Sequence, residues 1–274
     1  MSDSEEFASV RAEPDALRRG RRATELLTLY QQRSTELARL RRAAIEQARD
    51  ETGMSYTEIA AALGITKGRV TQIRGSAPTQ ERAFFGVGPV TIGVPYRYQT
   101  TDRERPLIAA EDAQAGESAT QLLHALGFAT TSMQIEPDMR ELPEGDALVI
   151  CGPKSAPIAA TLLDRDPVLA VVNHGGRWWI EDRETGIRHG SPSDEPEPLD
   201  ADIAYVARHV IDGRVIVHVA GLHAIGSLGA LHYLTANVAE LFTTADTSLS
   251  LIVRANYTGL EIDATELLAG PKTW

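Results

Sequence analysis

Side chains that can contact a nucleic acid are concentrated in the stretch MSYTEIAAALGITKGRVTQIRG, residues 54–75. Arg and Lys pair with guanine edges or phosphates, Gln bonds adenine in a bidentate manner, and Thr offers both a hydroxyl and a methyl group. The residues expected to contact DNA are Ser55, Tyr56, Thr66, Lys67, Arg69, Thr71, Gln72 and Arg74. Their types and spacing predict a surface that binds double-stranded DNA.

Two short helices joined by a tight turn account for this spacing. Ser55 with Glu58 three residues later matches a capping box for the first helix, and Thr66 is placed to cap the second. Gly64, between them, allows a left-handed turn that a side chain would hinder. Apolar residues recur at helical intervals on both sides of this glycine, at Ile59, Ala60, Leu63, Ile65, Val70 and Ile73.

This pattern resembles the helix-turn-helix of bacterial transcription regulators and of the promoter-reading domain at the end of sigma factors. The resemblance covers roughly residues 35–80. It implies that this part of the chain binds promoter or operator DNA. The alternative is an ordinary helical hairpin with a solvated basic face. The matching positions are Glu58, Ile59, Ala60, Leu63, Gly64, Ile65, Val70 and Ile73, with Thr71 and Gln72 on the exposed face.

The formal net charge of −11 is unevenly distributed along the chain. Residues 18–74 hold twelve Arg or Lys and six Asp or Glu, a net +6, and residues 1–17 come to −4. Residues 75–274, with fourteen basic and twenty-seven acidic groups, come to −13. A basic segment attached to acidic material indicates a local nucleic-acid contact, from which the acidic part is repelled.

Composition divides the chain into four parts. Residues 1–14 are acidic and expected to be disordered. Residues 15–78 are expected to form the helical DNA-binding domain, and residues 79–89, rich in turn residues, a linker. An apolar stripe within residues 15–50 predicts a helix, part of which supports the helix-turn-helix. The N-terminal part of this helix either dimerises or lies over the second domain. The second domain begins at residue 90.

In the second domain, residues 90–274, apolar strands alternate with helices. This alternation predicts a three-layer, mostly parallel, Rossmann-like α/β fold, made mixed by a hairpin at 177–190. The expected strands are residues 90–98, 130–135, 146–152, 214–220 and 248–257.

Two loops are placed to bind a small ligand, because ligands of open α/β sheets bind outside the carboxyl ends of the strands. CGPKS follows one buried strand and AGLHAIGSLG another. Glycine allows close approach to the backbone, helix N-termini attract anions, and a lysine adds positive charge, which suits a small anionic or nucleotide ligand. Glu111 and Asp112 are candidates to line the same crevice. The predicted ligand-binding residues are Arg97, Gly152, Lys154, Ser155, Gly221, His223, Gly226 and Ser227.

Catalytic and metal-binding patterns are weak. Cys151 and His223 with an acid are conceivable as a nucleophile, its base and an orienting group, but Cys151 ends an apolar strand, where an inert thiol is commoner. The loops match neither GxGxxG nor the P-loop, and no G-x-S-x-G or H-E-x-x-H occurs. We therefore expect no catalytic residues, metal or cofactor.

These features together resemble one-component bacterial transcription regulators, in which a helix-turn-helix module is joined to a sensor or oligomerisation domain. The resemblance implies a homodimer or higher homo-oligomer. Two alternatives remain: a Rossmann-type nucleotide-processing enzyme with a DNA-targeting domain, and an architectural protein that coats DNA. No apolar run has the length of a membrane span, and the start MSDSEEF is unlike a signal peptide, which favours a cytoplasmic, nucleoid-associated protein without membrane contact.

Overall fold

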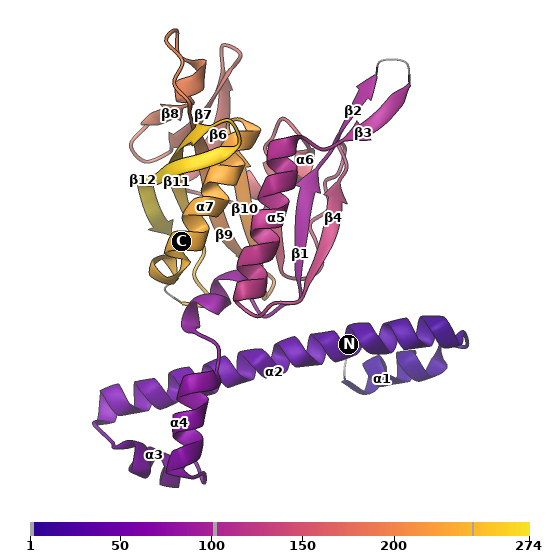
Figure 1. The fold of residues 1–274 in the computed structure, drawn as a ribbon, viewed down its shortest axis with the longest axis vertical. Coiled ribbons are helices and arrows are strands. Elements are labelled where there is room, and N and C mark those ends of the chain that lie inside the picture. Colours follow the sequence, from indigo (N-terminus) through magenta and orange to yellow (C-terminus); the bar gives the residue numbers. More distant parts are fainter. Residues whose placement is uncertain (1–2, 101–102, 243) are drawn as a thin grey trace. The chain divides into compact units, whose positions relative to one another are not determined.

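The computed structural model describes residues 3–100, 103–242 and 244–274, and the chain divides into two compact units. The first unit, Met1–Thr79, is helical, and the second, Gln80–Trp274, is built on a β-sheet (Figure 1). None of the helices in the described ranges combines the length and apolarity of a membrane span.

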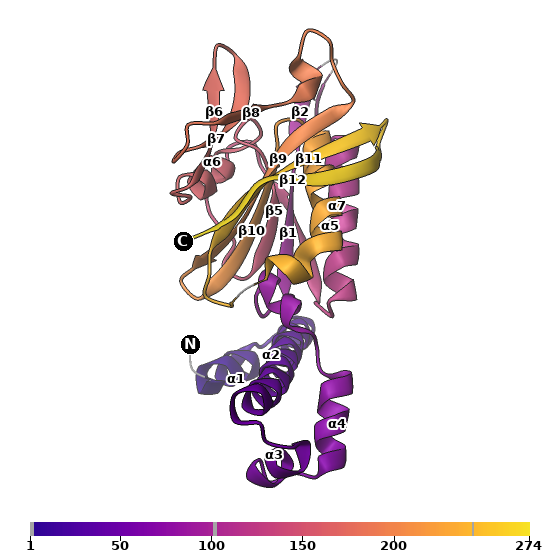
Figure 2. The ribbon, with the colours of Figure 1, turned by 90° about the vertical axis from the view of Figure 1, so that its left-hand side faces the viewer.

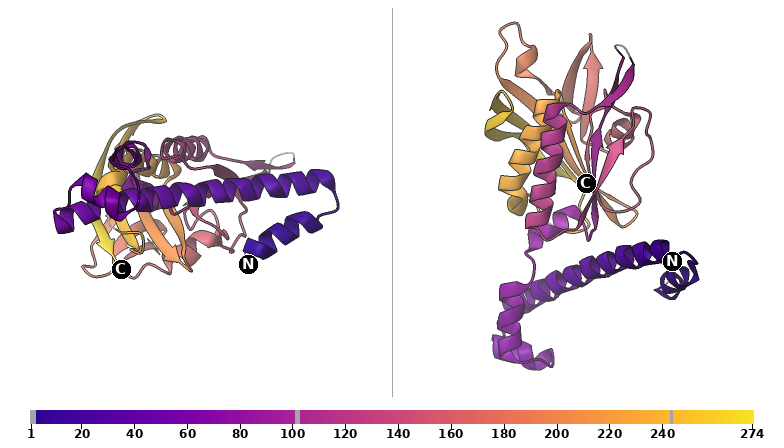
Figure 3. Two further views of the ribbon diagram at one scale, coloured as in Figure 1. Left: turned by 90° about the horizontal axis from the view of Figure 1, so that it is seen from below. Right: turned by 45° about the vertical axis from the view of Figure 1, so that its right-hand side comes forward.

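Four helices make up the first unit: α1 (Asp3–Ala12), α2 (Ala16–Thr52), α3 (Tyr56–Ala62) and α4 (Lys67–Ser76). The sequence predicts disorder for residues 1–14, but residues 3–12 form α1, which folds back along α2 (Figure 3). Phe7 stacks on Tyr30 with ring centroids 5.9 Å apart, and the Tyr30 hydroxyl donates to Glu6 over 3.0 Å. These contacts with α2 explain why the acidic segment is helical. They join residues far apart in the sequence, so local composition does not reveal them.

The apolar residues predicted to pack the two short helices do form a core. Ile59 and Ala60 of α3, Val70 and Ile73 of α4, and Ile45 of α2 are all buried together. The last third of α2 is therefore the supporting helix of the pair. Its Arg42 guanidinium also donates to the Ala77 carbonyl over 3.0 Å, which fixes the end of α4 to α2.

The second unit begins before residue 90. Residues predicted as a linker form a short 3₁₀ helix, η1 (Gln80–Phe85), whose Phe84 and Phe85 are fully buried in the core of the sheet. The buried Arg208 guanidinium donates to the carbonyls of Ala83 (3.1 Å) and Phe84 (2.9 Å). These residues are part of the α/β unit rather than a free connection.

A seven-stranded sheet forms the centre of this unit, in the order β12-β11-β9-β10-β5-β1-β4. Neighbours from β10 to β4 pair in parallel, and neighbours from β12 to β10 pair antiparallel, so five of the seven strands (β4, β1, β5, β10 and β11) run in one direction. The sheet is mixed because of β9 and β12, and not because of the hairpin predicted at 177–190, which belongs to a separate sheet. The strands of the seven-stranded sheet are β1 (Val90–Pro95), β4 (Thr130–Ile135), β5 (Ala147–Ile150), β9 (Ala201–Ile211), β10 (Arg214–Gly221), β11 (Leu249–Thr258) and β12 (Glu261–Thr273).

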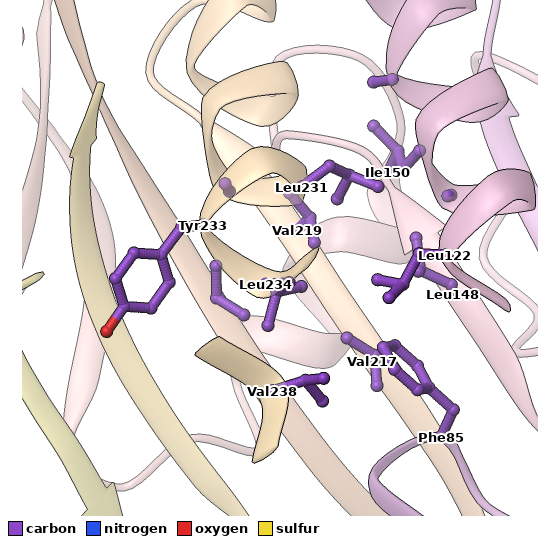
Figure 4. Close-up of a cluster of buried hydrophobic side chains, with 14 of the residues drawn as sticks. Phe85, Leu122, Leu148, Ile150, Val217, Val219, Leu231, Tyr233, Leu234 and Val238 are labelled. Atoms are coloured by element: carbon purple, nitrogen blue, oxygen red, sulfur yellow. The ribbon is translucent and has the colours of Figure 1, made fainter. Parts of the chain in front are cut away.

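The two faces of the sheet are covered differently (Figure 2). Helices α5 (Ala110–Ala125) and α7 (Ala224–Leu241) pack on one face, where Leu122, Leu148, Val217 and Leu231 meet in the main core (Figure 4). The short helix α6 (Pro157–Leu163) and a three-stranded antiparallel sheet cover the other face. That small sheet consists of β6 (Leu169–His174), β7 (Arg177–Asp182) and β8 (Arg188–Gly190), followed by η2 (Pro192–Asp194).

Alternating side chains explain how one strand serves both cores. In β5, Leu148 and Ile150 point to the α5–α7 face, whereas Ala147 and Val149 point to α6. A separate hairpin of β2 (Arg97–Thr100) and β3 (Glu104–Leu107) follows β1 and projects from the carboxyl edge of the sheet (Figure 1).

Candidate functional site

The turn between α3 and α4 has the geometry that the sequence predicts. The Ser55 amide donates to the Glu58 carboxylate over 2.8 Å, and the Glu58 amide donates to the Ser55 hydroxyl over 3.3 Å, which completes the capping box. The Ser55 hydroxyl also donates to the Glu58 carboxylate over 2.7 Å, and this bond, with a smaller contribution from the Ser55 amide, lowers the pKa of Glu58. Gly64 has a φ of +66°, and the Thr66 hydroxyl accepts from the Arg69 amide over 3.1 Å.

One face of α4 is exposed and carries the predicted DNA-contacting side chains. Lys67, Arg69, Thr71 and Gln72 are exposed, whereas Val70 and Ile73 of the same helix are buried in the core. The Arg69 guanidinium donates to the Gln72 side-chain oxygen over 2.6 Å. Arg69 and Gln72 therefore form a connected pair on this face.

Three other predicted contact residues also have structural partners. The Tyr56 ring lies between the guanidinium groups of Arg49 and Arg74, each 4.3 Å from the ring centroid, and both Tyr56 and Arg74 are half-buried. Ser55 is exposed, but its hydroxyl serves the cap. These residues join α2, α3 and α4 and border the exposed face of α4.

A second candidate site is a crevice of about 680 Å³ at the carboxyl ends of β1, β5 and β10. It forms there because the helix after β5 lies on one face of the sheet, whereas the helices after β1 and β10 lie on the other, so the connections diverge. Seven of the eight residues predicted to bind a ligand line it: Arg97, Gly152, Lys154, Ser155, Gly221, His223 and Ser227.

Gly226 is the predicted ligand residue that does not line this crevice. A Cβ atom there would lie 2.3 Å from the carboxylate of Asp202, a buried residue of β9. One oxygen of Asp202 accepts from the amides of His223 (2.8 Å) and Gly226 (3.0 Å), and the Gly221 amide donates to the Ser227 hydroxyl over 2.9 Å. Two amides at the start of α7 are thus used within the protein, which the glycine spacing alone does not reveal.

Charges of both signs line the crevice. The Lys154 ammonium donates to the Leu222 carbonyl over 2.5 Å, and the Asp112 carboxylate lies at the start of α5. Burial, with a smaller contribution from Glu111, raises the pKa of Asp112 to about 6, and Arg97 opposes this. The crevice is therefore not the purely cationic site that the two glycine loops suggest.

Aromatic residues of the β1–β3 region complete one wall. Tyr96 and Tyr98 line the crevice with Leu107, and the two tyrosine hydroxyls are 3.2 Å apart. The hydrogen bond between the two hydroxyls, together with burial, raises the pKa of Tyr96 to about 12. Tyr96 and Tyr98 were not predicted as site residues because residues 90–98 were expected to form one strand. The run PYRYQTTDRERP, rich in aromatic and charged residues, is the signal that marks an exposed hairpin.

An adjoining cavity of about 510 Å³ shares Lys154 and His223 with the crevice. The His223 ring nitrogen Nε2 lies 2.9 Å from Asp194, and Arg177 and Trp178 of β7 form the far wall. Trp178 also packs against the core beneath the small sheet, and Trp179 lies under Arg177, 4.4 Å from its guanidinium. The two tryptophans therefore have different surroundings, as expected from their alternation on one strand.

Cys151 is unsuited to act as a nucleophile. The residue is buried, its thiol donates to the Gly152 carbonyl over 3.5 Å, and burial raises the pKa of the thiol to about 12. Its carbonyl bonds His218 over 2.8 Å on the α6 face of the sheet. Within the part of the chain that the structure describes, no group of three or more His, Cys, Asp or Glu residues is arranged to hold a metal ion.

A larger groove, about 1020 Å³, runs between α5, α7 and the β11–β12 turn. Its lining is mainly aliphatic, including Leu122, Leu126 and Val238. Lysine and arginine are absent from its lining, so the crevice at the strand ends is the better candidate for binding a charged ligand.

Neither a protein-family model nor a curated protein matches this chain. Its function is therefore inferred from the geometry of the two sites: an exposed polar helix face in the first unit, and a charged crevice in the second.

Proposed function

We propose that this protein is a DNA-binding transcriptional regulator that contacts double-stranded DNA through α4 and binds a small ligand in its second unit. The observation that carries the proposal is the exposed face of α4, with Lys67, Arg69, Thr71 and Gln72 displayed by a capped helix pair. A helix of this kind enters the major groove, where such side chains distinguish base pairs. The net charge of +6 over residues 18–74 supports the same assignment.

The second unit is proposed to be a Rossmann-like sensor and dimerisation domain. Two features support this: β1, α5 and β4 form a parallel strand-helix-strand unit, and the crevice lies where the connections diverge to opposite faces. A two-fold dimer would place two copies of α4 on half-sites about one helical turn, roughly 34 Å, apart. The net negative charge of residues 75–274 would repel the phosphate backbone of DNA, which leaves DNA contact to the first unit.

Fluorescence anisotropy with duplexes selected from a random-sequence library tests the DNA assignment. We expect wild-type protein to bind a selected duplex and Lys67→Ala to weaken binding to selected and unselected duplexes alike, with a shallower salt dependence, since a phosphate contact carries no sequence information. Arg140→Ala, which removes an exposed arginine from the acidic second unit, is the charge-matched control and should leave affinity unchanged. Failure to select any duplex at low salt contradicts the proposal.

A further inference from the structure

We propose that the crevice at the carboxyl ends of β1, β5 and β10 binds a nucleoside phosphate, with its phosphate at Lys154, its ribose at Asp112 and its base against Tyr98. This inference rests on the ligand site of the proposed function and names the class of ligand. It differs from the expectation drawn from the glycine loops, in which helix N-termini hold an anion.

Part of the α7 N-terminus is already used within the protein, and α6 offers a short one. The His223 and Gly226 amides of the α7 start already donate to the buried Asp202 carboxylate. Helix α6 has only seven residues and begins at Pro157, which has no amide proton. Recognition therefore depends on the side chains that line the crevice.

Lys154 supplies the positive charge. Its ammonium group has three donors, one of which bonds the Leu222 carbonyl and holds the group at the loop between β10 and α7. No carboxylate in the described ranges forms an ion pair with it, and its side chain is exposed. Two donors and an uncompensated charge remain for a phosphate oxygen.

Asp112 supplies acceptors for hydroxyl groups. It is half-buried beside Glu111, and no side chain among the described residues donates a hydrogen bond to it. Its raised pKa reflects this incomplete compensation for burial. Two vicinal ribose hydroxyls would donate to the carboxylate and replace the water lost on burial, as acidic residues do in other α/β nucleotide sites.

Tyr98 supplies a flat apolar surface. Its side chain is 50% exposed, and its ring meets the Tyr96 ring edge-on with centroids 5.3 Å apart, which orients it. A base can stack on such a ring whatever its identity. The proposal therefore makes no distinction between purines and pyrimidines.

The order of these three residues matches the order of groups in a nucleotide. Lys154 lies between the ends of β5 and β10, Asp112 starts the helix after β1, and Tyr98 lies in the hairpin beyond β1. All three residues line the same crevice, which could therefore hold a phosphate, a ribose and a base in that sequence. The crevice volume of about 680 Å³ is within the usual range for small-molecule sites.

Isothermal titration calorimetry of the full chain with AMP, GMP, CMP and UMP tests the proposal. We expect at least one of them to bind, more tightly than its nucleoside and its 2′,3′-dideoxy form. In the wild type, each of these two preferences is expected to be about 10- to 100-fold in affinity. Lys154→Gln should abolish the preference for the nucleotide over the nucleoside. Asp112→Asn should abolish the preference for the ribose form over the dideoxyribose form. Tyr98→Ala should reduce affinity toward that of ribose 5-phosphate.

Glu117→Gln, on the exposed face of the same helix α5, is the matched control and should leave both preferences unchanged. Thermal unfolding of each variant shows that the fold is retained. Absence of binding by all four nucleotides up to about 1 mM, or equal affinities for wild type, Lys154→Gln and Asp112→Asn, overturns the proposal. Anisotropy with a selected duplex on the same preparations separates the outcomes: DNA binding without nucleotide binding contradicts only this inference, and the reverse contradicts only the DNA assignment.

Discussion

At the scale of single residues, the hydrogen bond between Arg69 and Gln72 changes how base recognition should be tested. Each side chain alone is expected to lose about 1–3 kcal/mol of binding free energy on replacement by alanine, the range for a lost base contact. Because they are bonded to each other over 2.6 Å, the two should act as one unit. A double-mutant cycle on a selected duplex should therefore give a coupling above about 0.5 kcal/mol; additive losses contradict a shared contact.

Two buried histidines predict a pH dependence of stability. Burial lowers the pKa of His209 to about 4, with help from Arg165, and lowers the pKa of His218 to about 3. At pH values between the ordinary histidine pKa, near 6.5, and these lowered pKa values, the unfolded chain binds more protons than the folded chain. The stability present above pH 6.5 is therefore lost as pH falls. The slope contributed is at most about 1.4 kcal/mol per pH unit for each histidine.

Urea unfolding between about pH 7 and pH 5 measures this slope. His209→Gln should make the dependence shallower, whereas the same substitution at the exposed His124 should leave it unchanged. A stability that is constant over this range, or that rises as pH falls, contradicts the assignment of both rings as neutral.

At the scale of secondary-structure elements, local signals predicted much of the fold. The caps at Ser55 and Thr66 and the turn at Gly64 are short-range features, and they appear where the sequence places them. Strands β1, β5, β10 and β11 contain apolar runs and were also expected, as was the more polar strand β4. Strands β9 and β12 were missed: β9 buries the charged side chain of Arg208, and β12 is largely exposed, so neither reads as a buried strand.

The crevice was predicted in part. Parallel strands followed by glycine loops indicate where a site should lie, and seven predicted residues are there. The role of Asp202 was not predictable, since it lies on β9 and reaches the start of α7 only through the antiparallel pairing of β9 with β10. Contacts of this kind depend on tertiary structure and leave no local pattern.

Gly226 gives a prediction at this scale. Because an added Cβ would lie 2.3 Å from Asp202 and 3.0 Å from the Ile203 carbonyl, Gly226→Ala should lower the free energy of unfolding of the second unit by about 1–3 kcal/mol. Gly145→Ala, where nothing lies within 4 Å of the new atom, is the matched control. Thermal unfolding of both variants decides; equal melting temperatures contradict the packing role of Gly226.

At the scale of the whole molecule, the boundary between the units decides which fragments should fold. Phe84 and Phe85 belong to the core of the second unit, so residues 80–274 should fold alone, whereas residues 90–274 should expose apolar surface and be markedly less stable. We further expect residues 80–274 to dimerise. Light scattering at tens of micromolar measures the mass of this fragment. A monomeric mass would mean that the first unit forms the dimer or that the protein does not dimerise.

The central claim is that this protein recognises a particular DNA sequence. The most direct measurement is the ratio of wild-type affinities, at one physiological salt concentration, for a duplex selected from a random library and for the same duplex with its sequence scrambled. A sequence-reading α4 predicts a ratio of about a thousand or more. A ratio near one, with both duplexes bound, would contradict the claim. It would identify a protein that contacts only the sugar-phosphate backbone of DNA.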